Sequence, residues 1–241
     1  MYKTPVAISS EKHARLRFVP AENYQFAARL TQTPLLAGEV VKAAEFYPVV
    51  FDLTNGMPIA VLGLTAERNL YLDEAYRWRV PMVPVCCSRY PFALVPVANE
   101  GEETQYIMVM DESAETLQEE KGKLLYNKNG DAGYRPSPLL KELKEQLGQI
   151  EEGLQRTQQL FAQLVQHQVL VAQQATFKNG EAEGRLDGFA VVDWEKVQNL
   201  DPELLAQWQQ AGLMDVLQAH TESMKQFNLL SHWLNAACTA A

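Results

Sequence analysis

Proline is spread unevenly along this chain, and the unevenness restricts the fold more than any other feature. No proline occurs between Pro138 and Pro202, whereas prolines recur throughout the residues before Pro138. Because proline removes a backbone donor and breaks helices and interior strands, long helices are expected only in the second half. The first half, with short apolar runs between prolines and turn residues, is typical of strands. We predict an α+β protein, with a mostly antiparallel sheet in the N-terminal half packed with long amphipathic helices from the C-terminal half.

The proline-free region carries apolar residues in steps of three and four, the period of a helix with one apolar face. A second such stripe, from Leu213 to Leu234, follows a predicted helix over Asp201 to Gly212. We expect the two striped helices to pack antiparallel, with a small hairpin over residues 175–192 between them in sequence; the alternative is that the seam joins two copies in a homodimer. The first stripe predicts a single helix of about thirty residues; its members are Leu140, Leu143, Leu147, Ile150, Leu154, Thr157, Phe161 and Leu164.

Two hairpins are predicted in the first half. The first pairs residues 48–53 with 58–64 around an Asn-Gly turn, because both turn residues tolerate the positive φ of a tight hairpin. The second pairs 91–95 with 106–110 around an acidic surface loop over 99–103.

Two shorter helices are also expected. One lies within residues 35–46, and the other begins at Ser113 as its N-cap and runs to Lys121. No internal repeat or low-complexity linker divides the 241 residues. We therefore predict a single domain over 1–241, strand-rich over 1–135 and helix-rich over 136–241.

Charge and location are read from the composition. The 30 acidic and 21 basic residues leave a net charge of -9, which disfavours a phosphate backbone as partner. No apolar run is long enough for a secretory signal or a membrane helix, so we expect no membrane insertion. Adjacent Cys86 and Cys87 rarely bridge each other, which favours reduced thiols and a cytoplasmic location.

The usual motifs of catalysis are missing from the sequence. It contains neither a glycine-rich phosphate loop nor a nucleophile elbow, so no nucleotide cofactor is predicted. The four histidines are far apart and no pair has the spacing of a helix-borne metal site. We predict no cofactor, no metal and no named catalytic residue.

One region combines arginines with large aromatic rings, which together suit a carboxylate joined to an apolar body. The candidate ligand is a peptide or an acidic small molecule. The structural alternative is that Arg89 pairs with an acidic residue such as Asp111 while the rings fill the core. His220, on the apolar stripe of the last predicted helix, is in the same way read as a hydrogen-bonded core histidine. The candidate binding residues are Tyr47, Trp78, Arg79, Arg89, Tyr90 and Phe92, with Asp111, Glu112 and His220 as polar partners.

Several short motifs occur in an order that resembles the SapC family of bacterial proteins, collinear from about Val6 to Trp233. The resemblance implies no catalytic residue for this chain. Family members are often encoded beside tryptophan-halogenase-like flavoproteins, cupin-like proteins and TonB-dependent receptors, which implies an accessory role in modifying or taking up a small molecule or peptide. The motifs are Phe46 to Phe51, Pro58 to Leu64 with Asn69 to Tyr71, Arg89 to Phe92, Asp111-Glu112 and Gly188 to Asp193.

Three hypotheses of function stay open at this point. The first is a non-catalytic cytoplasmic accessory protein that binds a small molecule, a peptide or a partner protein and supports a flavin-dependent halogenase-like or uptake system. The second is an enzyme acting on a peptide or amino-acid derivative, with Arg89 anchoring an anion. The third is an assembly or surface-layer-associated protein.

Overall fold

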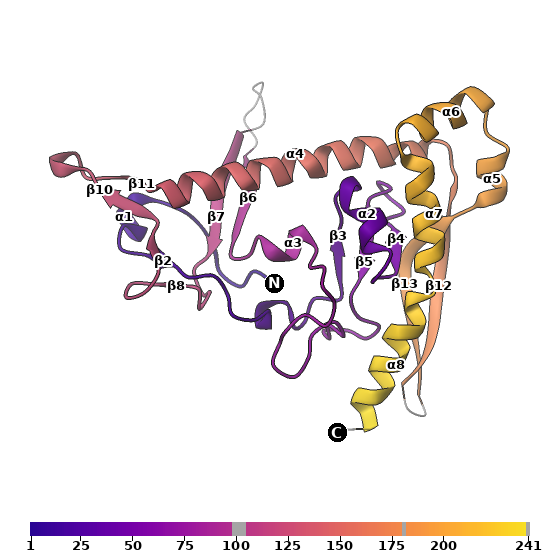
Figure 1. The fold of residues 1–241 in the computed structure, drawn as a ribbon, viewed down its shortest axis with the longest axis horizontal. Helices are drawn as coiled ribbons and strands as arrows, with labels where there is room; N and C mark the ends of the chain where they lie inside the picture. Colours follow the sequence, from indigo (N-terminus) through magenta and orange to yellow (C-terminus); the bar gives the residue numbers. More distant parts are fainter. Residues whose placement is uncertain (98–104, 180–181, 240–241) are drawn as a thin grey trace. The chain divides into compact units, whose positions relative to one another are not determined.

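The computed structural model describes residues 1–97, 105–179 and 182–239, and the chain forms two compact units (Figure 1). Unit 1 comprises Met1–Phe26 and Ser88–Glu152, and unit 2 comprises Ala27–Cys87 and Gly153–Ala241. Each unit takes residues from both halves of the chain, because one long helix begins in unit 1 and ends in unit 2. The boundary at residue 135 that composition suggests is therefore not a boundary between units.

Unit 1 is built from short antiparallel strands. β1, β7 and β6 form one sheet in the order β1-β7-β6, β8, β2 and β9 form a second in the order β8-β2-β9, and β10 pairs with β11. The elements are β1 (Pro5–Ala7), α1 (Ser10–His13), β2 (Arg17–Phe18), β6 (Phe92–Val97), β7 (Gln105–Asp111), β8 (Leu117–Gln118), β9 (Lys123–Leu124), β10 (Tyr126–Lys128), the 3₁₀ turn η2 (Gly130–Ala132), β11 (Tyr134–Pro136) and the first part of α4 (Pro138–Gln166).

The predicted second hairpin is the centre of unit 1. β6 and β7 pair antiparallel with Phe92 opposite Met110, and both side chains are buried in the core of this unit. Leu140 and Leu147 of α4 belong to the same core, so the first turns of the long helix cover this sheet. The acidic loop predicted over 99–103 lies outside the described residues.

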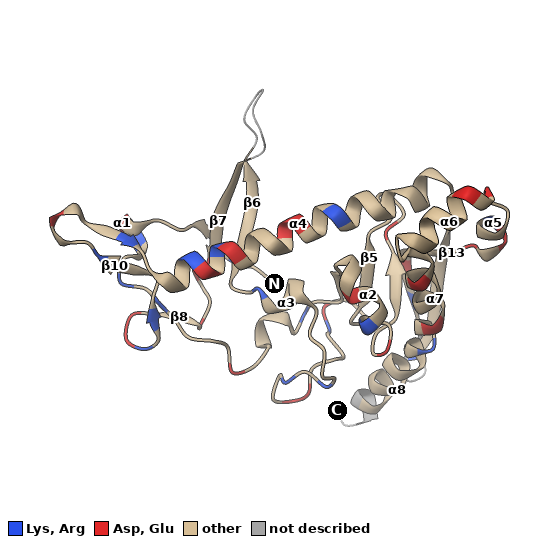
Figure 2. Cartoon of the chain, turned by 45° about the horizontal axis from the view of Figure 1, so that its top comes forward, with Lys and Arg blue, Asp and Glu red and all other residues tan. Residues whose placement is uncertain are grey.

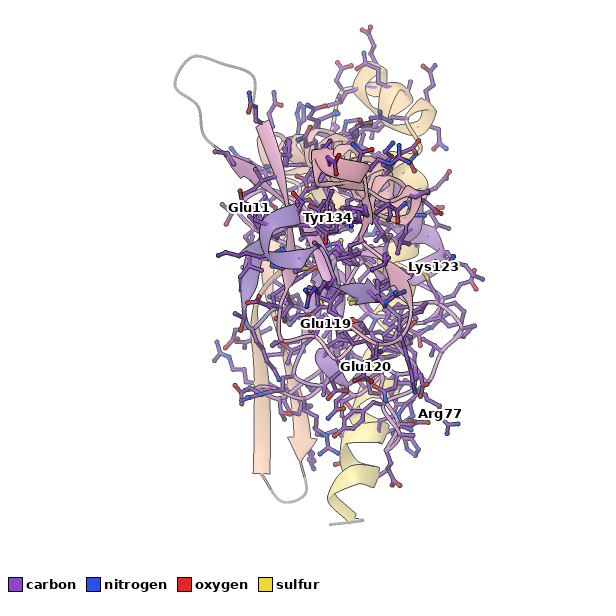
Figure 3. All side chains as sticks on the ribbon, turned by 90° about the vertical axis from the view of Figure 1, so that its left-hand side faces the viewer. Glu11, Arg77, Glu119, Glu120, Lys123 and Tyr134 are labelled. Atoms are coloured by element: carbon purple, nitrogen blue, oxygen red, sulfur yellow. The ribbon has the colours of Figure 1, made fainter. Side chains whose placement is uncertain are left out.

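The helix expected from Ser113 to Lys121 is wrong. These residues form turns and β8, which pairs with β2. The Ser113 hydroxyl donates to Asp111 (2.7 Å) instead of capping a helix, and Leu117 pairs with Phe18. Glu119 and Glu120 follow β8 with exposed side chains (Figure 3).

Unit 2 contains a five-stranded antiparallel sheet in the order β12-β13-β4-β5-β3. The predicted Asn-Gly hairpin joins β4 to β5; Gly56 has a φ of +73°, and the carbonyl of Phe161 lies so close that a Cβ would not fit. The strands are β3 (Gln32–Pro34), β4 (Val49–Phe51), β5 (Pro58–Val61), β12 (Leu170–Asn179) and β13 (Ala182–Val192).

The helices of unit 2 follow the caps and stripes of the sequence in most places. Asp201 caps α6 with its carboxylate on the Glu203 N–H (2.8 Å), and Gly212 ends it with a φ of +74°. The elements are α2 (Ala37–Ala43), the second part of α4, α5 (Trp194–Gln198), α6 (Pro202–Gln210), α7 (Leu213–Ser223) and α8 (Gln226–Thr239); η1 (Gln25–Ala27) and α3 (Val85–Ser88) lie where the chain passes between units.

The long helix is present as predicted, but its predicted partner is wrong. α4 has 29 residues, and charges of both signs occur along it (Figure 2). The stripe from Leu213 to Leu234 is divided between α7 and α8, and α7 packs chiefly against α2, α6, β13 and β4. In unit 2 the apolar face of α4 packs against the sheet, where Phe161 lies beside Phe51 (5.9 Å between ring centroids).

The predicted small hairpin is a longer ribbon that joins the main sheet. β12 and β13 pair from Leu170 opposite Val192 to their ends, and Ala190 of β13 pairs with Phe51 of β4. The register shifts at Gly188, whose φ is +82°, as in a bulge with glycine in the left-handed region. β12 is one of the two edge strands of the sheet, and β3 is the other.

Candidate functional site

The candidate binding residues that lie in unit 2 make contacts with other residues of that unit. Tyr47 is fully buried, and its hydroxyl accepts a hydrogen bond from Trp78 Nε1 (2.6 Å) and donates to the Met82 carbonyl. The ring centroid of Tyr47 also lies 4.5 Å from the ring centroid of Tyr71. Arg79 is exposed, and its Nε donates to the Leu72 carbonyl (3.1 Å).

The predicted residues of unit 1 form a second, separate set of contacts. Tyr90 stacks on Phe26 with ring centroids 4.1 Å apart, and its hydroxyl donates to Asp111 (3.1 Å). Phe92 is 1% exposed and belongs to the core. Arg89 is half-buried; among the described residues its Nε has no hydrogen-bond partner, and no ion pair links it to Asp111.

Asp111 is a buried carboxylate that holds the N-terminal strand in place. Its oxygens accept hydrogen bonds from the backbone N–H groups of Lys3 (2.8 Å) and Thr4 (3.0 Å) and from the hydroxyl and N–H of Ser113. Burial alone would raise the pKa of Asp111, but the bonds from Lys3, Ser113 and Thr4 outweigh it and lower the pKa to about 2. The neighbouring Glu112 is exposed, with Oε1 3.7 Å from His13 Nε2. Asp111 is thus saturated by groups of its own unit.

The predicted residues therefore divide between the units. Within unit 2, Tyr47 and Trp78 are hydrogen-bonded to each other, and within unit 1, Tyr90 and Asp111 are. Unit 2 holds Tyr47, Trp78, Arg79 and His220, and unit 1 holds Arg89, Tyr90, Phe92, Asp111 and Glu112.

His220 is a core histidine that links three elements of unit 2. Its Nδ1 donates to the Val49 carbonyl (2.6 Å), and its Nε2 accepts the Val192 N–H (3.2 Å), so the neutral tautomer with a proton on Nδ1 satisfies both neighbours. Burial, opposed by the bond to Val49, lowers the pKa of His220 from 6.5 to about 4. The imidazole is therefore neutral near pH 7.

One side of His220 faces a cavity that the sequence did not indicate. The cavity has a volume of about 350 Å³ and lies between the β12–β13 ribbon, the start of α5, and the adjoining ends of α7 and α8, elements that lie together in Figure 1. Its lining residues are Gln173, Gln174, Ala175, Phe189, Val191, Val192, Trp194, His220, Thr221, Met224 and Phe227.

The cavity is apolar and carries a few hydrogen-bonding groups. Phe189 and Phe227, which both line it, stack on each other with centroids 6.0 Å apart, and Trp194 Nε1 donates to the Thr221 hydroxyl (2.8 Å). Among the described residues that line it there is no Asp, Glu, Lys or Arg. Within the described residues, no three His, Cys, Asp or Glu side chains come together as a metal site.

Comparison with known proteins settles the family and nothing narrower. The family model SapC matches residues 8–230, which is most of the chain. The chain belongs to the SapC family. No curated protein and no solved structure matches it. No helix in the described part of this SapC-family chain is long and apolar enough to cross a membrane.

The cavity escaped prediction in this SapC protein because its walls look like ordinary core in sequence. Met224 and Phe227 continue the apolar stripe of the last predicted helix, and Phe189 lies in a predicted strand. The stripe predicts that these side chains are buried. The empty space between them depends on where the helical segment is interrupted, between α7 and α8. A signal that does exist is Gln173-Gln174, an uncharged polar pair that directly follows the apolar residues Leu170 to Ala172.

Proposed function

We propose that this SapC-family protein is a non-catalytic accessory protein that binds an uncharged apolar group, from a small molecule or a peptide, in the cavity beside His220. The observation that carries the proposal is the composition of the cavity wall. About 350 Å³ of space is lined mainly by aromatic and aliphatic side chains, and none of the lining residues that the structure describes is Asp, Glu, Lys or Arg. Such a wall favours an uncharged ring or branched chain over a carboxylate or an amine, because a charge there would lose its hydration without gaining a partner.

The size of the cavity sets the expected affinity. A group that buries roughly 150 Å² of apolar surface gains roughly 4 kcal/mol at about 25 cal/mol per Å². Loss of translational and rotational freedom opposes this gain, so additional polar contacts are needed for tight binding. The amides of Gln173 and Gln174 at the rim are the side chains that can supply them. A ligand whose only contribution is this buried group is therefore expected to bind no more tightly than a dissociation constant of about 1 mM, to which roughly 4 kcal/mol corresponds.

The state of His220 supports binding without catalysis. A general base needs a ring nitrogen within reach of the substrate proton. Both nitrogens of His220 are engaged by the backbone, Nδ1 with Val49 and Nε2 with Val192. Using either nitrogen for chemistry would break a buried hydrogen bond that holds α7 to the sheet.

The location of the protein is part of the proposal. Cys86 and Cys87 are buried thiols, as is usual for a protein kept in a reducing compartment. We infer a cytoplasmic location, where the bound group is held for a separate enzyme or uptake system.

A fluorescence titration tests the proposal. The probe is N-phenyl-1-naphthylamine, a neutral ring compound whose emission rises in apolar surroundings. We expect saturable binding at one site, and a loss of at least tenfold in affinity in the variant Met224→Trp, whose larger side chain fills the cavity.

The matched control is Met214→Trp in α7, the helix that Met224 follows as its C-cap. Met214 is half-buried and does not line the cavity, so this variant should bind the probe as the wild type does. Absence of saturable binding to the wild type, or equal binding by the two variants, would contradict the proposal.

A further inference from the structure

The cavity and the edge of the sheet lie at the same place. Three consecutive residues of the edge strand β12, Gln173, Gln174 and Ala175, form part of the cavity wall. The glutamines are exposed, so the cavity is reached along the edge strand itself. A ligand that pairs with β12 would therefore pass directly over the cavity.

The backbone of β12 has a side that faces away from β13. The Asp193 N–H donates to the Val169 carbonyl (2.8 Å), and the Val192 N–H points away from β12, to His220. Antiparallel pairs alternate along a ladder, so the pair of Leu170 with Val192 is a non-hydrogen-bonded one. By the same alternation, Ala172 directs its N–H and carbonyl outward, as Ala190 opposite it directs its own toward β4.

This edge lacks most of the features that keep strand edges from pairing. Within the described part of the chain no strand lies beyond β12, and the strand contains no proline and one charged residue, Lys178. Its ten residues exceed the usual length of a protected edge strand. Val171 is 42% exposed, and Ala172 is exposed as well. Two contacts lie close to this edge. α8 packs against β12, and the Gln174 N–H donates to the side-chain oxygen of Gln173 (3.1 Å), where both side chains are exposed and able to rotate away.

We propose that the apolar group bound in the cavity is a side chain of an extended partner polypeptide, which adds as a strand to the free edge of β12 around Ala172. Backbone hydrogen bonds to β12 supply affinity, and the cavity selects the one side chain that points into it. The partner segment is extended and carries an uncharged, bulky apolar residue. This inference rests on the proposed function, since it names the source of the bound group.

Selection from a phage-displayed library of random peptides, about twelve residues long, tests the inference against the full chain. We expect enriched peptides to share one apolar residue and to displace N-phenyl-1-naphthylamine. Ala172→Pro removes the outward N–H, and proline is tolerated at an edge strand, so the variant should fold. We expect it to bind the selected peptides at least tenfold more weakly and the dye within twofold of the wild type. Ala172→Val, which keeps the N–H, is the matched control and should bind both normally.

A circular dichroism spectrum and melting curve like those of the wild type establish that Ala172→Pro is folded. If it does not fold, the selected peptide is instead N-methylated at each backbone position in turn, and a loss at alternate positions is the expected result. Selected peptides that bind Ala172→Pro as well as Ala172→Val would overturn the inference.

The outcomes separate this inference from the proposed function. Dye binding without any enriched peptide leaves the cavity as a small-molecule site and overturns the strand addition. Absence of both overturns both proposals. Self-association of the wild type that Ala172→Pro abolishes would make a second copy the partner, which also overturns the inference.

Discussion

Replacing His220 with leucine tests how the cavity wall is held to the sheet. His220 is 1% exposed and bonds to the backbone of both β4 and β13. Leucine has a similar size and can keep the packing on Phe51, whose ring centroid lies 4.7 Å from that of the histidine. What the variant loses is therefore the pair of hydrogen bonds.

The size of the stability loss depends on which hydrogen bonds the two backbone groups keep in the variant. The Val49 carbonyl keeps a long hydrogen bond from the Ser223 hydroxyl (3.4 Å), whereas the Val192 N–H is left buried without its acceptor. An unsatisfied buried group costs about 1–3 kcal/mol. We expect His220→Leu to lower the free energy of unfolding at pH 7 by about 2–4 kcal/mol.

The same substitution should change the pH dependence of stability. In the unfolded chain the histidine takes a proton near pH 6.5, while the folded protein resists protonation until about pH 4 because burial lowers the pKa of His220. The stability that folding gains by keeping His220 neutral is therefore fully present above pH 6.5 and is lost as the pH falls toward 4. Over that interval, at about 1.4 kcal/mol per pH unit, the wild type loses about 3 kcal/mol that the variant does not lose.

Urea unfolding followed by circular dichroism at several pH values between 7 and 4 measures both effects. His232→Gln, at an exposed position of α8, is the control and should stay within about 0.5 kcal/mol of the wild type. The reasoning is refuted if His220→Leu is as stable as the wild type at pH 7, or if the difference between them does not shrink on acidification.

Three further substitutions test other contacts. Asp111→Asn replaces one acceptor oxygen by a donor and should cost unit 1 about 2–3 kcal/mol; faster amide hydrogen exchange at Lys3 and Thr4 would show it, and unchanged exchange would contradict it. Thr157→Val removes the hydroxyl that accepts the Ala37 N–H (2.8 Å), so the unfolding free energy should fall by about 1–2 kcal/mol, and no change in the urea midpoint would count against it. Gly188→Ala forces a side chain into a φ of +82°, with a cost of about 1–2 kcal/mol in the same assay, although nothing lies within 4 Å of the added Cβ.

Local signals in the sequence were sufficient for the elements that depend on near neighbours. The seam from Leu140 to Leu164 predicts α4, because a helix of that length is specified by its own apolar face. The Asn-Gly turn predicts the β4–β5 hairpin, since Gly56 occupies a position that needs positive φ. Asp201 and Pro202 predict the start of α6 for the same local reason.

Features set by distant contacts could not be predicted. The stripe from Leu213 to Leu234 contains no proline or glycine, so nothing local marks the break between α7 and α8. Ser113 is a residue type typical of an N-cap, but its hydroxyl donates a hydrogen bond to the carboxylate of Asp111 instead. The cavity arises where β12, β13, α7 and α8 meet, and neither its volume nor its uncharged wall is specified by one segment.

The most direct test of the central claim uses the methionine methyl groups. The chain has seven methionines, of which Met224, the C-cap of α7, lines the cavity, while Met214 of α7 does not. In a carbon-13 methyl spectrum titrated with N-phenyl-1-naphthylamine, we expect the Met224 resonance to shift most, because the bound ring lies against it, and the Met214 resonance to stay nearly unchanged. A shift of Met214, Met57 or Met108 with Met224 unmoved would contradict the account.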